Sequence, residues 1–140
     1  MEQEIYFSEY EVKAFEQPIA EWRRLSSWKK ALNSPCRSVV TETEGRVYQV
    51  FDDLGFNFLT KADGESIYHI WVFFKLSKKP LPIEPKQRFT GTLRLGRYRL
   101  RGGISHDEAQ FLEGSYIGPF SVKLSQDNER VTRCSVSFGE

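Results

Sequence analysis

Residues 46–76 read RVYQVFDDLGFNFLTKADGESIYHIWVFFKL, and this stretch decides the fold. Apolar and polar side chains alternate along three segments of it, as they do along half-buried β-strands. The turn Asp52-Asp53-Leu54-Gly55 offers a glycine for a positive φ, and Asp63-Gly64 is a strong hairpin signal. The stretch therefore predicts three antiparallel strands, the last of them running from Ser66 to Leu76.

Further strands are expected on both sides of this stretch. Residues 5–14 alternate like one or two strands, and residues 89–95 and 98–101 form a hairpin across Gly96-Arg97. Near the end of the chain, residues 120–124 face residues 134–138 across an Asp127-Asn128 turn.

Two helices complete the pattern. An apolar stripe at spacings of three and four predicts a helix that begins near Pro18 and ends at Asn33-Ser34-Pro35, although Ser26-Ser27 could instead cap a shorter helix from Trp28. Ser105 to Glu108 has the form of a capping box and predicts a short helix through Leu112. We expect an α+β fold, in which an antiparallel, strongly twisted sheet of about seven strands carries one or two short helices packed on one face. Residues 1–140 are expected to form a single domain.

Composition limits the classes of function. Twenty basic and nineteen acidic residues give a net charge of +1, which argues against a dedicated nucleic-acid-binding protein. No apolar stretch reaches the ~20 residues that span a bilayer, and the acidic start lacks the features of a secretory signal. Cys36 and Cys134 have no neighbouring ligand residues at metal-site spacing. We therefore expect a cytoplasmic protein with reduced thiols that binds no membrane, no metal and no cofactor.

Residue types typical of catalysis have simpler interpretations here. Ser105-His106-Asp107 are adjacent on a predicted helix, so their side chains diverge and cannot form the relay of a catalytic triad, whereas Ser105 suits a helix cap. Asp52 and Asp53 are typical turn residues that bond to local amides. The sequence therefore favours a protein that is not an enzyme.

Two groups of residues are candidates for binding a partner. His69, Trp71 and Phe73 alternate along one strand; they either pack under a helix or form an exposed aromatic anchor. Arg94, Arg99 and Arg101 belong to the densest cluster of charge; they form a solvated strand face, or bind an acidic protein surface, or bind nucleic acid.

A recognisable pattern lies in Trp28-Lys-Lys-Ala-Leu-Asn-Ser-Pro-Cys-Arg37, Val47-Tyr-Gln-Val-Phe-Asp-Asp-Leu-Gly-Phe56 and Phe89-Thr-Gly-Thr-Leu-Arg-Leu95. Through these segments the chain resembles, over about residues 28–138, a family of small bacterial proteins of unknown biochemistry. Asn33 stands where the family pattern has glycine, and Phe56 where it has an aliphatic residue. Asparagine also tolerates the left-handed conformation that ends a helix.

Members of that family are similar to immunity proteins encoded beside secreted antibacterial toxins. The resemblance therefore implies a cytoplasmic immunity protein whose partner is a cognate toxin, which an aromatic and arginine surface would occlude. Alternatives are a structural or adaptor component of a bacterial secretion system, and a small nucleic-acid-binding protein that uses the arginine-rich hairpin.

Overall fold

A computed structural model describes residues 3–42, 45–127 and 129–138. The strands are β1 (Glu4–Phe7), β2 (Val12–Ala14), β3 (Gln17–Pro18), β4 (Arg37–Val40), β5 (Arg46–Phe51), β6 (Phe56–Lys61), β7 (Ile67–Phe73), β8 (Thr92–Leu95), β9 (Tyr98–Leu100), β10 (Tyr116–Ile117), β11 (Phe120–Asp127) and β12 (Arg130–Ser137). The helices are α1 (Leu25–Leu32), α2 (His106–Ala109) and a 3-10 turn, η1 (Gln110–Leu112).

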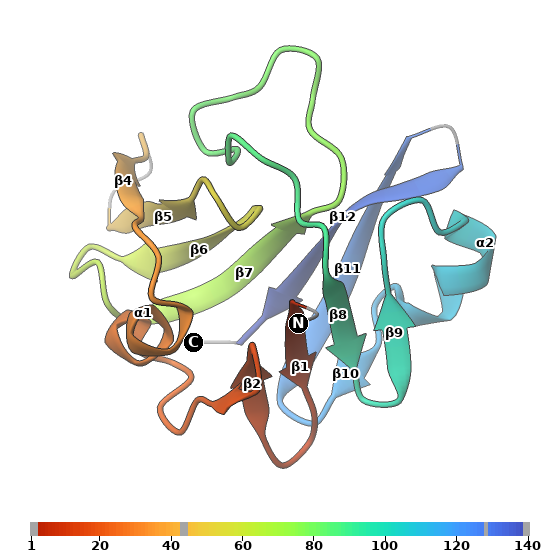
Figure 1. The fold of residues 1–140 in the computed structure, drawn as a ribbon, viewed down its shortest axis with the longest axis horizontal. Coiled ribbons are helices and arrows are strands. Elements are labelled where there is room, and N and C mark those ends of the chain that lie inside the picture. Colours follow the sequence, from red (N-terminus) through yellow and green to blue (C-terminus); the bar gives the residue numbers. More distant parts are fainter. Residues whose placement is uncertain (1–2, 43–44, 128, 139–140) are drawn as a thin grey trace.

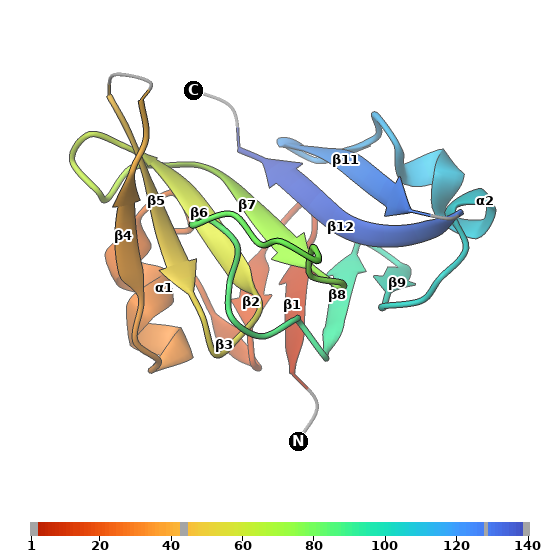
Figure 2. The same cartoon turned by 90° about the horizontal axis from the view of Figure 1, so that it is seen from above.

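The expected antiparallel sheet of seven strands is present, in the order β10-β11-β12-β7-β6-β5-β4. Every neighbouring pair in it is antiparallel. It forms one layer of the molecule (Figure 1) and spreads from β4 at one side to β11 at the other (Figure 2). The fold is mostly β, and it contains the two short helices that we expected, α1 and α2.

A second sheet, in the order β3-β2-β1-β8-β9, was not expected. Its central pair, β1 and β8, is parallel and joins residues 4–7 to residues 92–95. The β8–β9 hairpin itself confirms the prediction, with Leu95 opposite Tyr98. We missed the sheet because hairpin signals are local, whereas the β1–β8 pairing connects distant segments without a turn between them.

The inner faces of the two sheets enclose a common hydrophobic core. Phe7 of the smaller sheet contacts Trp28 of α1 and, from the larger sheet, Phe120, at ring-centroid distances of 6.0 and 5.1 Å. Trp28 also contacts Phe58, at 4.9 Å. Helix α2 adds Ala109, which is fully buried. No helix among the described residues is long and apolar enough to cross a membrane.

Helix α1 begins at Leu25, later than the position near Pro18 that the apolar stripe predicted. The residues before it bond instead to the beginning of β7 and the turn that precedes it: the Leu25 amide donates to the Glu65 carbonyl, and the Ile67 amide donates to the Arg23 carbonyl. These bonds hold Arg24 extended and delay the helix. Its C-terminal cap is Asn33 at φ 47°, as asparagine allows.

A bulge changes which residues of β7 face outward. The register shifts between Leu59 and Thr60 on the neighbouring strand β6. Ile67 is therefore buried in the core, although regular alternation along the strand would put it on the same face as His69. Tyr68 is turned away from the core. From His69 onward the predicted alternation holds, with Ile70 and Val72 in the core.

The strand that was expected to reach Leu76 ends at Phe73. Two further local predictions are confirmed. Strands β11 and β12 pair with Val122 opposite Val136 and Leu124 opposite Cys134. Asn128, which we placed in their turn, lies outside the described residues. Ser105 caps α2, accepting a hydrogen bond from the Glu108 amide at 3.4 Å.

Candidate functional site

The outer face of the seven-stranded sheet is built by the residues that alternate with its core positions. Residues that pair across β6, β7, β12 and β11 form two rows on this face. One row consists of Leu59, His69, Ser137 and Ser121, and the next consists of Asn57, Trp71, Ser135 and Lys123. A third row pairs Phe73 with Arg133. Aromatic side chains of β7 thus stand beside small serines of β12, with cations at the margin.

The charge on this sheet is strongly one-sided. Its described strands contain one acidic residue, Asp127, and six basic residues, which are Arg37, Arg46, Lys61, Lys123, Arg130 and Arg133. Asp127 lies at the tip of β11 and pairs with Lys75 at 2.9 Å. We call the outer surface around Arg46, Lys61, Lys123 and Arg133 the basic face. Because the whole chain has a net charge of only +1, this face differs from the average surface.

Three of the four cations of the basic face lie over its aromatic rings. The Arg46 guanidinium lies 5.4 Å and the Lys61 ammonium 5.9 Å from the centroid of the Tyr68 ring. The Arg133 guanidinium lies 5.6 Å from the Trp71 ring and 5.8 Å from the Phe73 ring. Such contacts restrain long side chains, so the positive charges are held in fixed positions.

His69 is an uncharged part of this face at neutral pH. Burial lowers its pKa to about 4, and the nearby charges of Arg46 and Lys123 act in the same direction. The Trp71 indole N–H donates to His69 Nε2 at 2.8 Å, which places the imidazole proton on Nδ1. The two rings therefore form one rigid unit between the cations.

Of the three predicted β7 residues, Phe73 is least available to a partner, because it is only 1% exposed. His69 and Trp71 are half-buried. The aromatic stripe is therefore neither fully packed under a helix nor a fully exposed aromatic anchor, which were the two alternatives. The Trp71 and Phe73 rings both lie against the Arg133 guanidinium.

The segment that follows β7 folds back over one end of the sheet and is held there by Arg37. Its guanidinium makes two hydrogen bonds to Asp52, at 2.7 and 3.1 Å, and donates to the carbonyls of Pro82 and Glu84. Partial burial raises the pKa of Asp52, but the Arg37 hydrogen bond and charge and the Lys86 amide outweigh it, so the pKa lies below its ordinary value. Asp52 is thus a structural anion.

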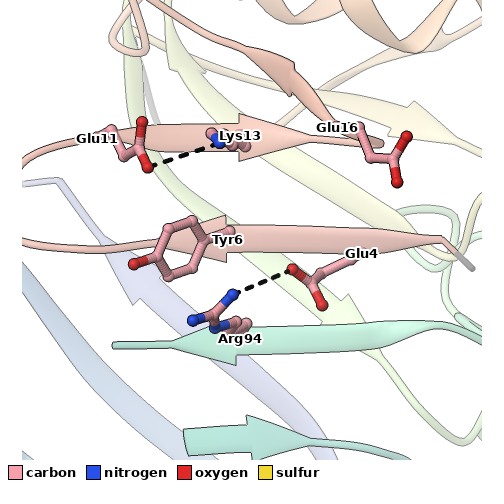
Figure 3. A pocket seen from close by; sticks show the side chains of 6 residues that line it. All are labelled: Glu4, Tyr6, Glu11, Lys13, Glu16 and Arg94. Carbon is pink, nitrogen blue, oxygen red and sulfur yellow. Dashed lines mark ion pairs between the residues drawn. The ribbon is translucent and has the colours of Figure 1, made fainter. Parts of the chain in front are cut away.

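The second predicted group lies on the smaller sheet, where the outer face carries mixed charge. A hollow of about 340 Å³ there is lined by Glu4, Tyr6, Glu11, Lys13, Glu16 and Arg94. Figure 3 shows Arg94 of β8 beside Tyr6 and Glu4 of β1, 4.4 Å from the Tyr6 ring and 3.8 Å from the Glu4 carboxylate. Glu11 and Lys13 form a second ion pair, at 3.7 Å.

The two other predicted arginines, Arg99 and Arg101, lie on β9 and directly after it in the same hairpin. Arg99 is opposite Arg94 in the β8–β9 register and is exposed. Arg101 donates from Nε to Thr92 Oγ1 at 3.0 Å. Leu93 and Leu100 point into the core that both sheets share, so Arg94 and Arg99 point away from it. The structure therefore brings Arg94 and Arg99 together but separates them from the basic face, which is on the opposite side of the molecule.

The residue types typical of catalysis are distributed through the fold. Asp52 is committed to Arg37, and His106 lies on the short helix α2, beside its cap. Both cysteines are free thiols, and burial raises the pKa of Cys134 well above its ordinary value. Within the described residues, no group of three or more His, Cys, Asp and Glu side chains is positioned to hold a metal ion.

Sequence reasoning missed Arg46, Lys61, Lys123 and Arg133. The signal was present, because Arg46, Lys61 and Lys123 occupy outward positions of predicted strands, Arg133 directly precedes another, and the described strands of this sheet contain a single acid, Asp127. The order of the strands was needed to bring these four residues onto one face. Clustering along the chain instead drew attention to residues 94–101.

Together, the two sheets and the basic face define a small β domain with a one-sided surface charge. The chain belongs to the family described as Domain of unknown function (DUF7738), whose model matches residues 4–110. The matched part ends before β11 and β12, so two of the four residues of the basic face lie outside it. No curated protein and no solved structure matches the chain.

Proposed function

We propose that this protein is a non-catalytic binding protein, and that it is a cytoplasmic immunity protein that covers a cognate bacterial toxin with its basic face. The observation that carries the proposal is the charge of the seven-stranded sheet: four cations share one outer face, and three of them lie over aromatic rings. A surface of this kind attracts an acidic protein surface and speeds its association. The toxin as partner rests on the family resemblance in the sequence.

The nucleic-acid alternative has less support at the arginine hairpin than the sequence suggested. Arg94 is paired with Glu4, and Glu11 and Glu16 line the same hollow. Carboxylates at these positions would repel a phosphate backbone as strongly as the arginines attract it. We therefore place the partner on the opposite side, at the basic face.

The proposal is tested by co-expression with the product of the adjacent gene. We expect the two proteins to form a complex and the cells to survive the toxin. Charge reversal on the basic face, Lys61→Glu with Lys123→Glu, should slow association by at least about tenfold at low salt, because steering depends on these charges. Arg99→Glu, on the opposite side, is the matched control and should leave both binding and protection intact.

Two outcomes would contradict the proposal. The immunity function is wrong if the adjacent gene product is neither bound nor neutralised. If instead the protein assembles stably with components of a secretion apparatus and gives no protection, the structural or adaptor function is correct.

A further inference from the structure

A hollow at one end of the basic face is suited to receive an anionic group. It encloses about 360 Å³ between the segment after β7 and the β11–β12 hairpin. Its lining residues are Lys75, Leu76, Ser77, Lys78, Glu84, Gln126, Asp127, Thr132 and Arg133. Arg133 belongs both to the hollow and to the basic face, so the two are continuous.

The two acidic residues of the hollow are already bonded to their surroundings. The Glu84 carboxylate, in a residue only 4% exposed, accepts from Ser77 Oγ at 2.6 Å and from the Leu81 amide at 3.0 Å. Asp127 pairs with Lys75 at 2.9 Å. Glu84 therefore holds the segment after β7 together, whereas Asp127 links the two walls and neutralises one of the three cations.

The other two cations, Lys78 and Arg133, form no ion pair with any residue that the structure describes. Arg133 is held by the Trp71 and Phe73 rings, so its planar guanidinium is oriented before a ligand arrives. A fixed guanidinium suits a carboxylate, which it can bind through two parallel hydrogen bonds. Lys78 is exposed on a flanking loop and can add a second positive charge.

We propose that this hollow is the anchor point of the interface, where Arg133 and Lys78 bind a carboxylate side chain that projects from the partner protein. The inference rests on the proposed function and adds the position and chemistry of the central contact. Trp71 and Phe73 act here as positioning residues, because they set the orientation of Arg133.

Carboxylate is favoured over nucleic acid by two features of the site. Nucleic-acid strands bind to aromatic platforms on which bases stack, but Phe73 is buried and Arg133 lies over the Trp71 ring. Among the described residues, the hollow also offers only two cations outside ion pairs, which match a single carboxylate, whereas a nucleic-acid strand is bound along a basic groove that follows several phosphates.

The test measures binding of poly-L-glutamate to the full chain by titration calorimetry, at low salt. We expect Arg133→Met and Lys78→Met each to weaken binding about tenfold, since each removes charged hydrogen bonds to the carboxylate. Lys61→Met is the matched control: it removes one positive charge from the same face outside the hollow, and should weaken binding less than about threefold. Thermal unfolding shows whether each variant is folded. Lys78→Met, which alters only an exposed loop, carries the test if Arg133→Met does not fold.

The inference is wrong if the three variants weaken binding equally, or if none does. It is also wrong if a ten-residue thymidine oligonucleotide binds more tightly than poly-L-glutamate and loses that binding in Arg133→Met, because the site is then a nucleic-acid site. Failure here is distinguishable from failure of the proposed function. A toxin that is neutralised equally well by Arg133→Met and the unaltered protein leaves the immunity function standing and removes the hollow from it.

Discussion

Replacing Gly55 with alanine should be among the most damaging single changes in this protein. Gly55 has a φ of +88°, and a Cβ built on it would overlap the Phe89 amide nitrogen and lie 2.5 Å from the Arg88 carbonyl carbon. Unbonded carbon atoms normally approach to about 3.5–4.0 Å. The segment at residues 88–89 must therefore move away from the turn.

The expected magnitude follows from what that movement breaks. Phe89 donates to the Phe73 carbonyl at 2.7 Å, and this hydrogen bond is lost when the segment moves. Leaving these buried groups without a partner costs about 2 kcal/mol, and a left-handed alanine adds about 1–2 kcal/mol. We expect Gly55→Ala to lower the free energy of unfolding by about 3–4 kcal/mol, before any loss from displacing the buried Phe89 ring.

The chain supplies a matched control in Gly103. Its φ is +83°, close to that of Gly55, but no atom lies within 4 Å of a Cβ built there. Gly103→Ala should therefore cost only the backbone strain of about 1–2 kcal/mol. Urea unfolding of both variants, with the slope checked for two-state behaviour, measures the difference. The reasoning is refuted if Gly55→Ala lies within about 1 kcal/mol of Gly103→Ala.

Three further predictions concern a turn, an ion pair and a histidine. Glu16 has a φ of 70° in the two-residue turn between β2 and β3, a conformation that favours glycine. Glu16→Gly should therefore stabilise the protein by about 1 kcal/mol and raise the Tm by about 3 °C in a thermal scan. An unchanged or lower Tm contradicts this. Arg37→Met should cost about 2 kcal/mol at neutral pH. The cost of Arg37→Met should fade in acid, because the pKa of Asp52 is lowered from its unfolded value of 3.8 in the folded protein. The stability that this gives is present above pH 3.8 and is lost as the pH falls through the folded pKa. Urea unfolding at neutral pH and near pH 2 tests this, and an equal cost at both pH values would contradict it. The pKa of His69 is lowered from 6.5 to about 4, so unfolding takes up a proton in that range and stability should fall as the pH drops through it; His69→Gln should flatten this part of the Tm profile.

Much of the fold was predictable because its strands are joined by tight local turns. Gly55 has the positive φ that the turn requires, and the hairpin of β11 and β12 has the expected register. Each of these features depends on a few neighbouring residues whose conformational preferences are strong. Such signals do not depend on the rest of the chain.

The features that we missed depend on contacts between distant segments. The parallel pairing of Glu4–Phe7 with Thr92–Leu95 has no turn to announce it. The late start of α1 is caused by hydrogen bonds from residues 23–25 to residues 65–67, which override the helical stripe. In both cases tertiary hydrogen bonds compete with local propensity and prevail.

The candidate site was predictable in part for the same reason. Alternation along β7 correctly directed His69 and Trp71 to one face of the sheet. The cations around them come from four other strands, and Lys123 is separated from Trp71 by the intervening strand β12. A face assembled from several strands becomes visible only when their order is known.

The position of β12 has a consequence for how the chain folds. Strands β4 to β7 follow one another and can pair as they are synthesised, but the other edge of β7 must wait for residues 130–137. Until then, β7 exposes unpaired amides and carbonyls beside Ile70 and Val72, which is the kind of edge that promotes aggregation. Contacts of such long range also slow folding. Removing the last strand should therefore yield an insoluble chain rather than a smaller folded one.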